Sequence, residues 1–299
     1  MEGIIAGLLA AGLLAAFLAP KLRLRRALAR PLAPELLLIL ERNVVQYAGM
    51  EPAQQGRLRR LVQQFLHEKN FVGCAGLELT DEMRVTIAAQ ACLLVLGRAG
   101  DAVPAVVYSS LHAVLVYPGA FLVPRREVDG AGVVTERRQD LLGESWGDGR
   151  VILSWDHVRR AGMIDAPSHN VVVHEFAHQL DSESGSTNGA PYLGSTERYR
   201  SWSEVLSRHY AELRRDAMWG QQGVLDHYGA SSPAEFFAVA TEAFFEQPWD
   251  LAARHPDLFG EFQKYYRVDP RRWLPEPQPE PHPDFSEPWG GNVVYGQWR

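Results

Sequence analysis

A chain of 299 residues, 46% of them hydrophobic, can bury the core of one large domain or of two modest ones. Its 36 acidic and 30 basic side chains are spread along the chain and leave a net charge of −6, which argues against a nucleic-acid-binding protein. The two cysteines, Cys74 and Cys92, are too few for a disulfide framework and indicate a reducing compartment.

The N-terminal segment has the pattern of a membrane anchor. Residues 3–19 carry no charged side chain, and basic residues cluster between Lys21 and Arg30. A helix spans a bilayer with about 17 to 25 apolar residues, so this run predicts a short span. Because the positive charges follow the run, the positive-inside rule places the remainder on the cytoplasmic face of the inner membrane. We therefore expect residues 1–32 to form a membrane anchor with a basic flank.

The elements that follow are mostly helical. Apolar residues recur every three or four positions and predict helices at 33–66 (two helices), 80–96, 170–180, 197–215, 233–245 and 256–266. Short β-branched and apolar runs bounded by turn residues predict strands at 106–108, 113–117, 121–123 and 150–154. This is an α+β fold in which helices surround a small central sheet. We expect one domain over residues 33–272 and a flexible proline-rich tail over residues 273–299.

One segment has the spacing of a metal site. In His174-Glu-Phe-Ala-His178 two histidines lie four positions apart, so on a helix both imidazoles face one ion and Glu175 points toward a water bound to it. Three valines precede His174 and predict a buried helix, where two histidines and a glutamate without a partner would be costly. Zinc lowers the pKa of bound water from about 15.7 towards 7, and a carboxylate can then remove its proton.

A catalytic zinc needs a third protein ligand. The extension HExxHxxGxxH is absent, because Asp181 and Ser184 stand where its glycine and third histidine belong. The remaining candidates are carboxylates on later helices: Glu197, Glu204, Glu235 and Glu242. Glu235 and Glu242 lie seven positions apart on one face of an otherwise apolar helix that Ser231 or Ser232 caps. At least one of them should serve the site, but the spacing does not say which.

Other motifs are weaker. Five histidines have no partner at metal-binding spacing and are interpreted as surface or core residues: His157, His169, His209, His227 and His255. The chain contains no Walker loop, no GxGxxG and no glycine-flanked serine elbow, so neither nucleotide use nor serine hydrolysis is supported.

The motifs resemble those of the Mlc titration factor A family of zinc peptidases over most of residues 60–270, and more distantly the catalytic domain of anthrax lethal factor. The resemblance is carried by residues 112–118, 174–181, 188–191, 228–235, 237–239 and 242–245. It implies a zincin-like domain in which His174, His178 and Glu235 bind one Zn²⁺ and Glu175 is the general base. It also implies that Tyr228 faces the metal, where its phenol could stabilise the oxyanion. Residues 1–32 lie outside the resemblance.

Two more carboxylates are expected close to the ligands. Zinc-bound imidazoles usually donate their other N–H to a carboxylate or a carbonyl, and we assign this role to Asp181 and Glu242. Asp181 could instead cap the exit of the chain from the helix. The resemblance implies hydrolysis of short peptides, in the manner of an aminopeptidase, with a peptide as the substrate partner and no nucleic acid. The alternative is a binding role, in which the protein sequesters a transcriptional repressor of sugar uptake.

Overall fold

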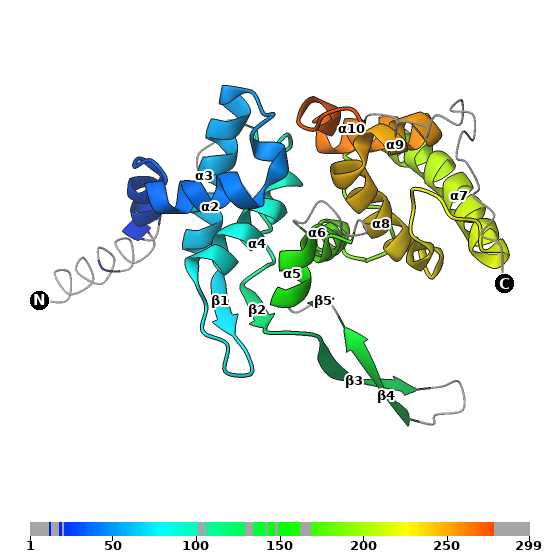
Figure 1. The fold of residues 1–299 in the computed structure, drawn as a ribbon, viewed down its shortest axis with the longest axis horizontal. Helices are drawn as coiled ribbons and strands as arrows, with labels where there is room; N and C mark the ends of the chain where they lie inside the picture. The colour runs from blue at the N-terminus through cyan, green and yellow to red at the C-terminus, as the bar shows by residue number, and fades with distance from the viewer. Residues whose placement is uncertain are drawn as a thin grey trace, which may run out of the picture.

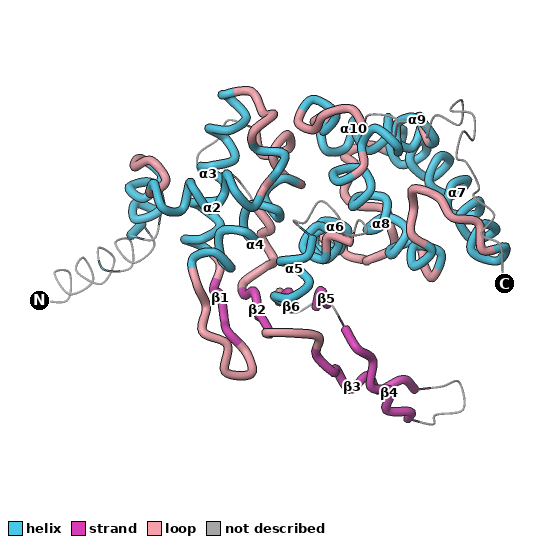
Figure 2. The backbone as a smooth tube through the Cα atoms, viewed as in Figure 1, coloured by secondary structure: helices cyan, strands magenta, loops and turns pink. Residues whose placement is uncertain are grey.

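The computed structural model describes residues 12, 18–19, 21–100, 105, 107–128, 134–141, 143–146, 149–161 and 169–277. Helices make up most of this part of the chain and strands form a small sheet beside them (Figures 1 and 2). The predicted α+β class is confirmed.

The sheet is small and mainly parallel. Its strands, in spatial order, are β1 (Asn70–Gly73), β2 (Ala113–Tyr117), β6 (Arg150–Ser154) and β5 (Gly143–Trp146). β2 pairs in parallel with both neighbours, and β5 pairs antiparallel to β6 at one edge. β3 (Phe121–Val128) and β4 (Val134–Leu141) form a separate antiparallel hairpin that extends away from the helices (Figure 2).

The N-terminal helices pack on one side of the molecule (Figure 1). They are a helical segment at residues 21–28, α2 (Pro34–Asn43), the short η1 (Val45–Tyr47), α3 (Pro52–Glu68) and α4 (Asp81–Leu93). The Thr80 side chain caps α4 by accepting a hydrogen bond of 3.3 Å from the Met83 amide. α4 is buried along most of its length because it packs against α2, α3, α5 and α6.

The C-terminal helices form the second group. They are α5 (Trp155–Ala161), α6 (Val171–Ser182), α7 (Thr196–Trp219), η2 (His227–Ala230), α8 (Pro233–Glu246), α9 (Pro248–Arg254), α10 (Pro256–Tyr266) and η3 (Pro270–Arg272). In this group, α6 packs against α4 of the N-terminal helices, and α8 packs against both α6 and η2 (Figure 1). An aromatic core joins α7, α8 and α10, in which Trp202 stacks on Phe262 at 5.3 Å between ring centroids and Phe244 stacks on Tyr266 at 5.5 Å.

The expected membrane anchor is contradicted. Among the residues that the structure describes, no helix is both long and apolar enough to cross a membrane. The predicted membrane partner and the predicted location at the inner membrane depend on this anchor and are therefore wrong as well. The segment 21–28, expected as the basic flank, packs on α3 instead: Leu24 and Leu28 are buried, and the Gln63 side chain donates a hydrogen bond of 2.9 Å to the Ala27 carbonyl. Most of residues 1–20 lie outside the described part of the chain.

Two further predictions concern a strand at residues 106–108 and the C-terminal tail. The strand predicted at 106–108 is not found at Val107 and Tyr108, where Tyr108 has a positive φ of 46°. The predicted tail over 273–299 begins at a residue that is packed on the domain, because Trp273 stacks on Phe245 at 6.4 Å and donates a hydrogen bond to Gln54. Residues 278–299 lie outside the described residues.

Candidate metal centre

α6 presents the two histidines on its face toward α8. Asn170 caps the helix by accepting a hydrogen bond of 3.1 Å from the Val173 amide. The valines of the first turn, together with Phe176, are buried in the core, as the sequence predicts. This packing fixes the rotation of α6, so that His174 and His178 keep 13% and 12% of their side-chain surface open to solvent.

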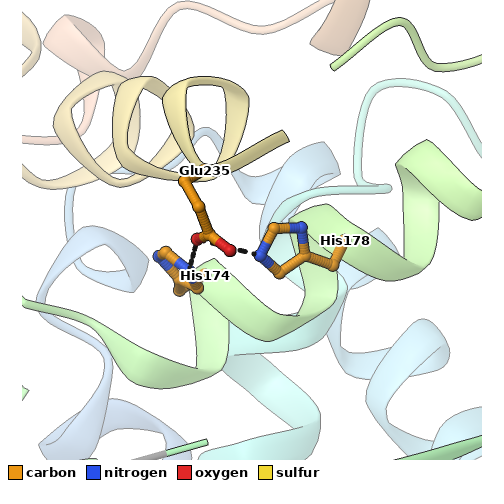
Figure 3. A group of neighbouring side chains, drawn as sticks. All are labelled: His174, His178 and Glu235. Carbon is orange, nitrogen blue, oxygen red and sulfur yellow. Dashed lines mark hydrogen bonds and ion pairs between the residues drawn. The ribbon is translucent and has the colours of Figure 1, made fainter. Parts of the chain in front are cut away.

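α8 brings a carboxylate to the same place. Ser232 caps the helix by accepting a hydrogen bond of 3.2 Å from the Glu235 amide, and Pro233 occupies its first turn. Residues 236–245, which follow the first turn of the helix, are all buried, so its position on α6 is set by packing. Glu235, in the first turn, keeps 23% of its side-chain surface exposed and points between the two imidazoles (Figure 3).

The three side chains converge on one point. Oε2 of Glu235 lies 3.0 Å from Nε2 of His174 and 3.3 Å from Nε2 of His178 (Figure 3). All three donor atoms lie within 4.8 Å of one another. Metal–ligand bonds of about 2.1 Å in a tetrahedral arrangement would hold donors about 3.4 Å apart. Two imidazoles and one carboxylate at this spacing fit a single metal ion and leave a fourth position for water or substrate.

The charges of the three groups are linked. Burial lowers the pKa of His174, but hydrogen bonds to Glu235 and Glu242 outweigh this effect and raise the pKa well above its ordinary value. Burial raises the pKa of Glu235, and hydrogen bonds with the two histidines reverse the effect and lower the pKa to about 2. Both shifts favour a charged imidazole beside a charged carboxylate, and a metal ion that binds there must displace the imidazole proton.

Glu242 holds the far side of the His174 ring. Its Oε1 lies 2.6 Å from Nδ1 of His174, and its Oε2 accepts a hydrogen bond of 2.8 Å from the Asn170 amide. Only 5% of its side-chain surface is exposed. With Nδ1–H directed at this carboxylate, Nε2 of His174 is the ring nitrogen that can bind a metal ion once its own proton has left. This geometry matches the orienting role expected for Glu242.

Glu246 extends this contact and was not expected from the sequence. One helical turn after Glu242, its Oε1 accepts a hydrogen bond of 2.8 Å from the Asn170 side chain and one of 3.5 Å from Gln46. Burial raises the pKa of Glu246 to about 7, and the nearby charge of Glu242 adds to the shift. The four-residue spacing of Glu242 and Glu246 is the only sequence signal that could have revealed it.

Glu175 and Tyr228 lie beside the triad. Glu175 is 5% exposed, and its charge contributes to the raised pKa of His174. Tyr228 lies on η2, and its ring centroid is 5.9 Å from that of His174. Almost half of the Tyr228 surface, 49%, is exposed. The expected base and the expected phenol are therefore both close to the candidate ligands, and their roles remain predictions.

The main contact of Asp181 is with the chain that follows α6, as in the second of the two roles expected for it. It is fully buried, and its Oδ2 accepts a hydrogen bond of 2.7 Å from the Gly189 amide. Within the described residues, neither Oδ1 of Asp181 nor Nδ1 of His178 has a hydrogen-bond partner, although the charge of His178 lowers the pKa of Asp181 against the larger, raising effect of burial. Asp181 thus anchors the chain that follows α6, and its orienting role for His178 stays a prediction.

Gly189, the partner of Asp181, contacts three helices, whereas the sequence placed it only within the segment 188–191 that carries the family resemblance. Its carbonyl accepts a hydrogen bond of 2.9 Å from the Trp202 indole of α7. Its φ is +79°, and a Cβ there would lie 2.4 Å from the carbonyl oxygen of Pro233, at the start of α8. Only glycine allows this close approach, so the residue fixes how α8 begins relative to α6.

The structure separates the four carboxylate candidates for the third ligand. Glu197 and Glu204 are exposed on α7, Glu242 contacts the outer nitrogen of His174, and Glu235 groups with both histidines. Of the four, Glu235 is therefore the candidate that the fold places beside both histidines.

Comparisons with known proteins agree with this site. A model of the family described as glucose-regulated metallo-peptidase M90 matches residues 19–267. An uncharacterised protein of Synechocystis is 39% identical over 242 residues, which cover 81% of this chain and 86% of that protein. Mlc titration factor A of Klebsiella pneumoniae is 34% identical over 232 residues, with 77% and 84% covered, and that of Escherichia coli is 32% identical over 229 residues, with 76% and 83% covered. The resemblance to anthrax lethal factor stays a prediction, whereas that to the Mlc titration factor A family is confirmed, and the chain belongs to the M90 family of metallopeptidases.

Proposed function

We propose that this protein is a zinc-dependent peptidase that hydrolyses short peptides from a free amino terminus. The observation that carries the proposal is the convergence of His174, His178 and Glu235 at distances that suit one tetrahedral ion. Nitrogen and carboxylate donors in this combination are those of catalytic zinc sites. The preference for a free amino terminus rests on the family resemblance and not on the spacing of the site.

The side chains around the site have separate tasks in such a reaction. A zinc ion held by the triad supplies Lewis acidity, which polarises a peptide carbonyl and makes water acidic near neutral pH. The Glu175 carboxylate accepts the proton of the attacking water and then delivers it to the nitrogen of the leaving amine. The phenol of Tyr228 donates a hydrogen bond to the carbonyl oxygen as that oxygen gains negative charge. Glu242 orients the His174 ring through the hydrogen bond at Nδ1, so that Nε2 would be free to bind the ion.

The test combines metal content with turnover. The purified protein is assayed on a short peptide with a free amino terminus and on its N-acetylated twin, before and after treatment with a chelator and readdition of zinc. We expect Glu175→Gln to keep its zinc and lose about 100- to 10,000-fold in rate. Glu204→Gln is the matched control, because it removes an exposed carboxylate of α7. Peptidase rates that do not change in Glu175→Gln would refute the catalytic assignment, and equal cleavage of both peptides would refute the aminopeptidase preference.

A second candidate function is the binding of a transcriptional repressor. The names of the Klebsiella and Escherichia relatives favour it, because Mlc titration factor A is named for titrating another protein. The Glu175→Gln variant separates the two functions, since it should retain a partner surface while it loses turnover. A pull-down with the purified repressor, using the wild type and this variant side by side, measures binding independently of hydrolysis.

A further inference from the structure

A second group of metal-binding side chains lies on helices other than those of the triad. His209 is on α7, Glu212 follows it by one turn, and His255 is the residue between α9 and α10. Their donor atoms lie within 4.8 Å of one another. His209 and His255 have no metal-binding spacing in the sequence, because 46 positions separate them and only the fold brings them together.

The geometry of this group repeats that of the triad. The ring centroids of His209 and His255 are 5.0 Å apart at an interplanar angle of 87°, and those of His174 and His178 are 4.9 Å apart at 80°. Nδ1 of His209 lies 3.2 Å from Oε2 of Glu212, which is close to the donor separation of about 3.4 Å around a tetrahedral ion. The donor set is again two imidazoles and one carboxylate.

The outer nitrogen of His209 is also held by a carboxylate. Its Nε2 lies 2.9 Å from Oδ1 of Asp257, and Arg208 pairs with the other oxygen of Asp257. Metal-binding histidines usually donate their second N–H to such a group, which fixes the ring and its tautomer. Asp257 therefore contacts the outer nitrogen of His209, as Glu242 contacts that of His174. The other nitrogen of His209, Nδ1, faces Glu212.

The same three side chains line a small cavity. Its volume is about 20 Å³, and Asp216 and the loop residues 223–225 complete its wall. A cavity of this size has room for about one water molecule or one ion. Burial lowers the pKa of His209 and of His255, and the neutral imidazole is the form that binds metals. Asp216 or one water molecule can supply a fourth ligand.

The geometry points to a second divalent-metal site in this chain, with His209, Glu212 and His255 as ligands for Zn²⁺ and Asp257 as the residue that positions His209. The site is structural, because it ties the C-terminal half of α7 to the α9–α10 junction. It also borders loop 221–225, which leads directly to η2 and Tyr228. The proposal does not depend on peptidase activity.

Metal content of the full-length protein gives the first test. The wild type, purified with zinc present, should carry two zinc ions per chain, and both His174→Ala/His178→Ala and His209→Ala/His255→Ala should carry one. His67→Ala, which removes an exposed histidine of α3, is the matched control and should keep two. The proposal is overturned if the second double variant holds as much zinc as the wild type.

A milder variant keeps the test decisive if His209→Ala/His255→Ala does not fold. Zinc added to metal-free His174→Ala/His178→Ala should raise its melting temperature by several degrees, because a ligand that binds only the folded state stabilises it. Adding Glu212→Gln, which changes a side chain that is 43% exposed, should remove most of that rise. No rise in the first variant, or an equal rise in both, would show that these residues do not bind zinc.

Discussion

Glu242 lies 2.6 Å from Nδ1 of His174, on the side of the ring opposite to the point where the candidate metal ligands meet. The same helix, α8, also supplies Glu235 at 3.0 Å from Nε2 of that ring. One helix therefore controls both nitrogens of one imidazole, and the orientation of His174 depends on how α8 packs on α6.

Changes at Glu242 should weaken metal binding without removing a ligand. We expect Glu242→Ala to lower zinc affinity by about 10- to 100-fold, because the ring loses the acceptor that holds it, and Glu242→Gln to lower it less. Competition with a chelator of known affinity measures the effect. Glu204→Gln should leave the affinity unchanged, and an unchanged affinity in Glu242→Ala would show that α6 alone orients the ring.

Zinc affinity should rise with pH. In the metal-free protein the pKa of His174 is raised, so a proton stays on the ring to higher pH than on a free histidine and must leave when zinc binds. Affinity measured at about pH 6, 7 and 8 should increase at each step, by up to about tenfold per unit for each proton released. In Glu242→Gln one of the two contacts that raise the pKa is weakened, and the rise should move to lower pH. A flat profile in the wild type would contradict the shared proton.

Tyr228→Phe should slow the reaction and leave the metal in place. The Tyr228 ring is near His174 but is not part of the ligand group, so zinc content should not change. Loss of a hydrogen bond to a developing oxyanion lowers kcat by about 100- to 1,000-fold. Tyr192→Phe, an exposed tyrosine at 62%, is the matched control. Equal kcat values for Tyr228→Phe and the wild type would assign Tyr228 to packing alone.

Glu246 should make the fold less stable as the pH rises. Its pKa of about 7 in the folded protein exceeds the ordinary value of 4.5, so the folded state holds the proton more tightly and stability falls between these two pH values. We expect this part of the loss to be on the order of 1 to 3 kcal/mol. Glu246→Gln cannot ionise and should be less sensitive to pH in thermal unfolding between about pH 5 and 8. Parallel curves for the two proteins would contradict the assignment.

Gly189→Ala should disturb the metal centre from a distance. The new Cβ would collide with the Pro233 carbonyl and displace the first turn of α8, which carries Glu235. We expect a loss of about 1 to 3 kcal/mol in stability from the strained backbone, more from the collision, and a lower zinc affinity. Gly185→Ala is the matched control, because its φ is +95° but nothing lies within 4 Å of its Cβ. If both variants bind zinc equally well, the contact does not position Glu235.

Local patterns predicted the parts of the site that lie within one helix. His174, Glu175 and His178 follow from four-residue spacing. A serine cap for α8 follows from residue type and the proline after it, although the sequence left Ser231 and Ser232 open and the structure has Ser232. The third ligand did not follow, because Glu235 and Glu242 share a helix face. Only the offset between α6 and α8 decides which carboxylate meets which nitrogen.

The features of the fold that were not predicted from the sequence have the same cause, because they depend on contacts between different segments of the chain. β1 has only four residues and β4 is rich in charged residues, so neither carries an apolar alternation, and both are defined by their pairing partners. The anchor was inferred from the length of an apolar run and from the basic residues that follow it, and this local pattern does not reveal the tertiary packing of Leu24 and Leu28. His209 and His255 looked unrelated because 46 positions separate them in the chain.

The burial of α8 bears on how the protein would take up a metal ion. Ten consecutive residues of this helix, Phe236 to Phe245, are buried, so apolar packing brings Glu235 to the two histidines without help from an ion. This differs from a zinc finger, which collapses only around its metal. Protein stripped by a chelator should therefore keep its helical circular dichroism and regain full occupancy of the triad on simple mixing with zinc, with no refolding step.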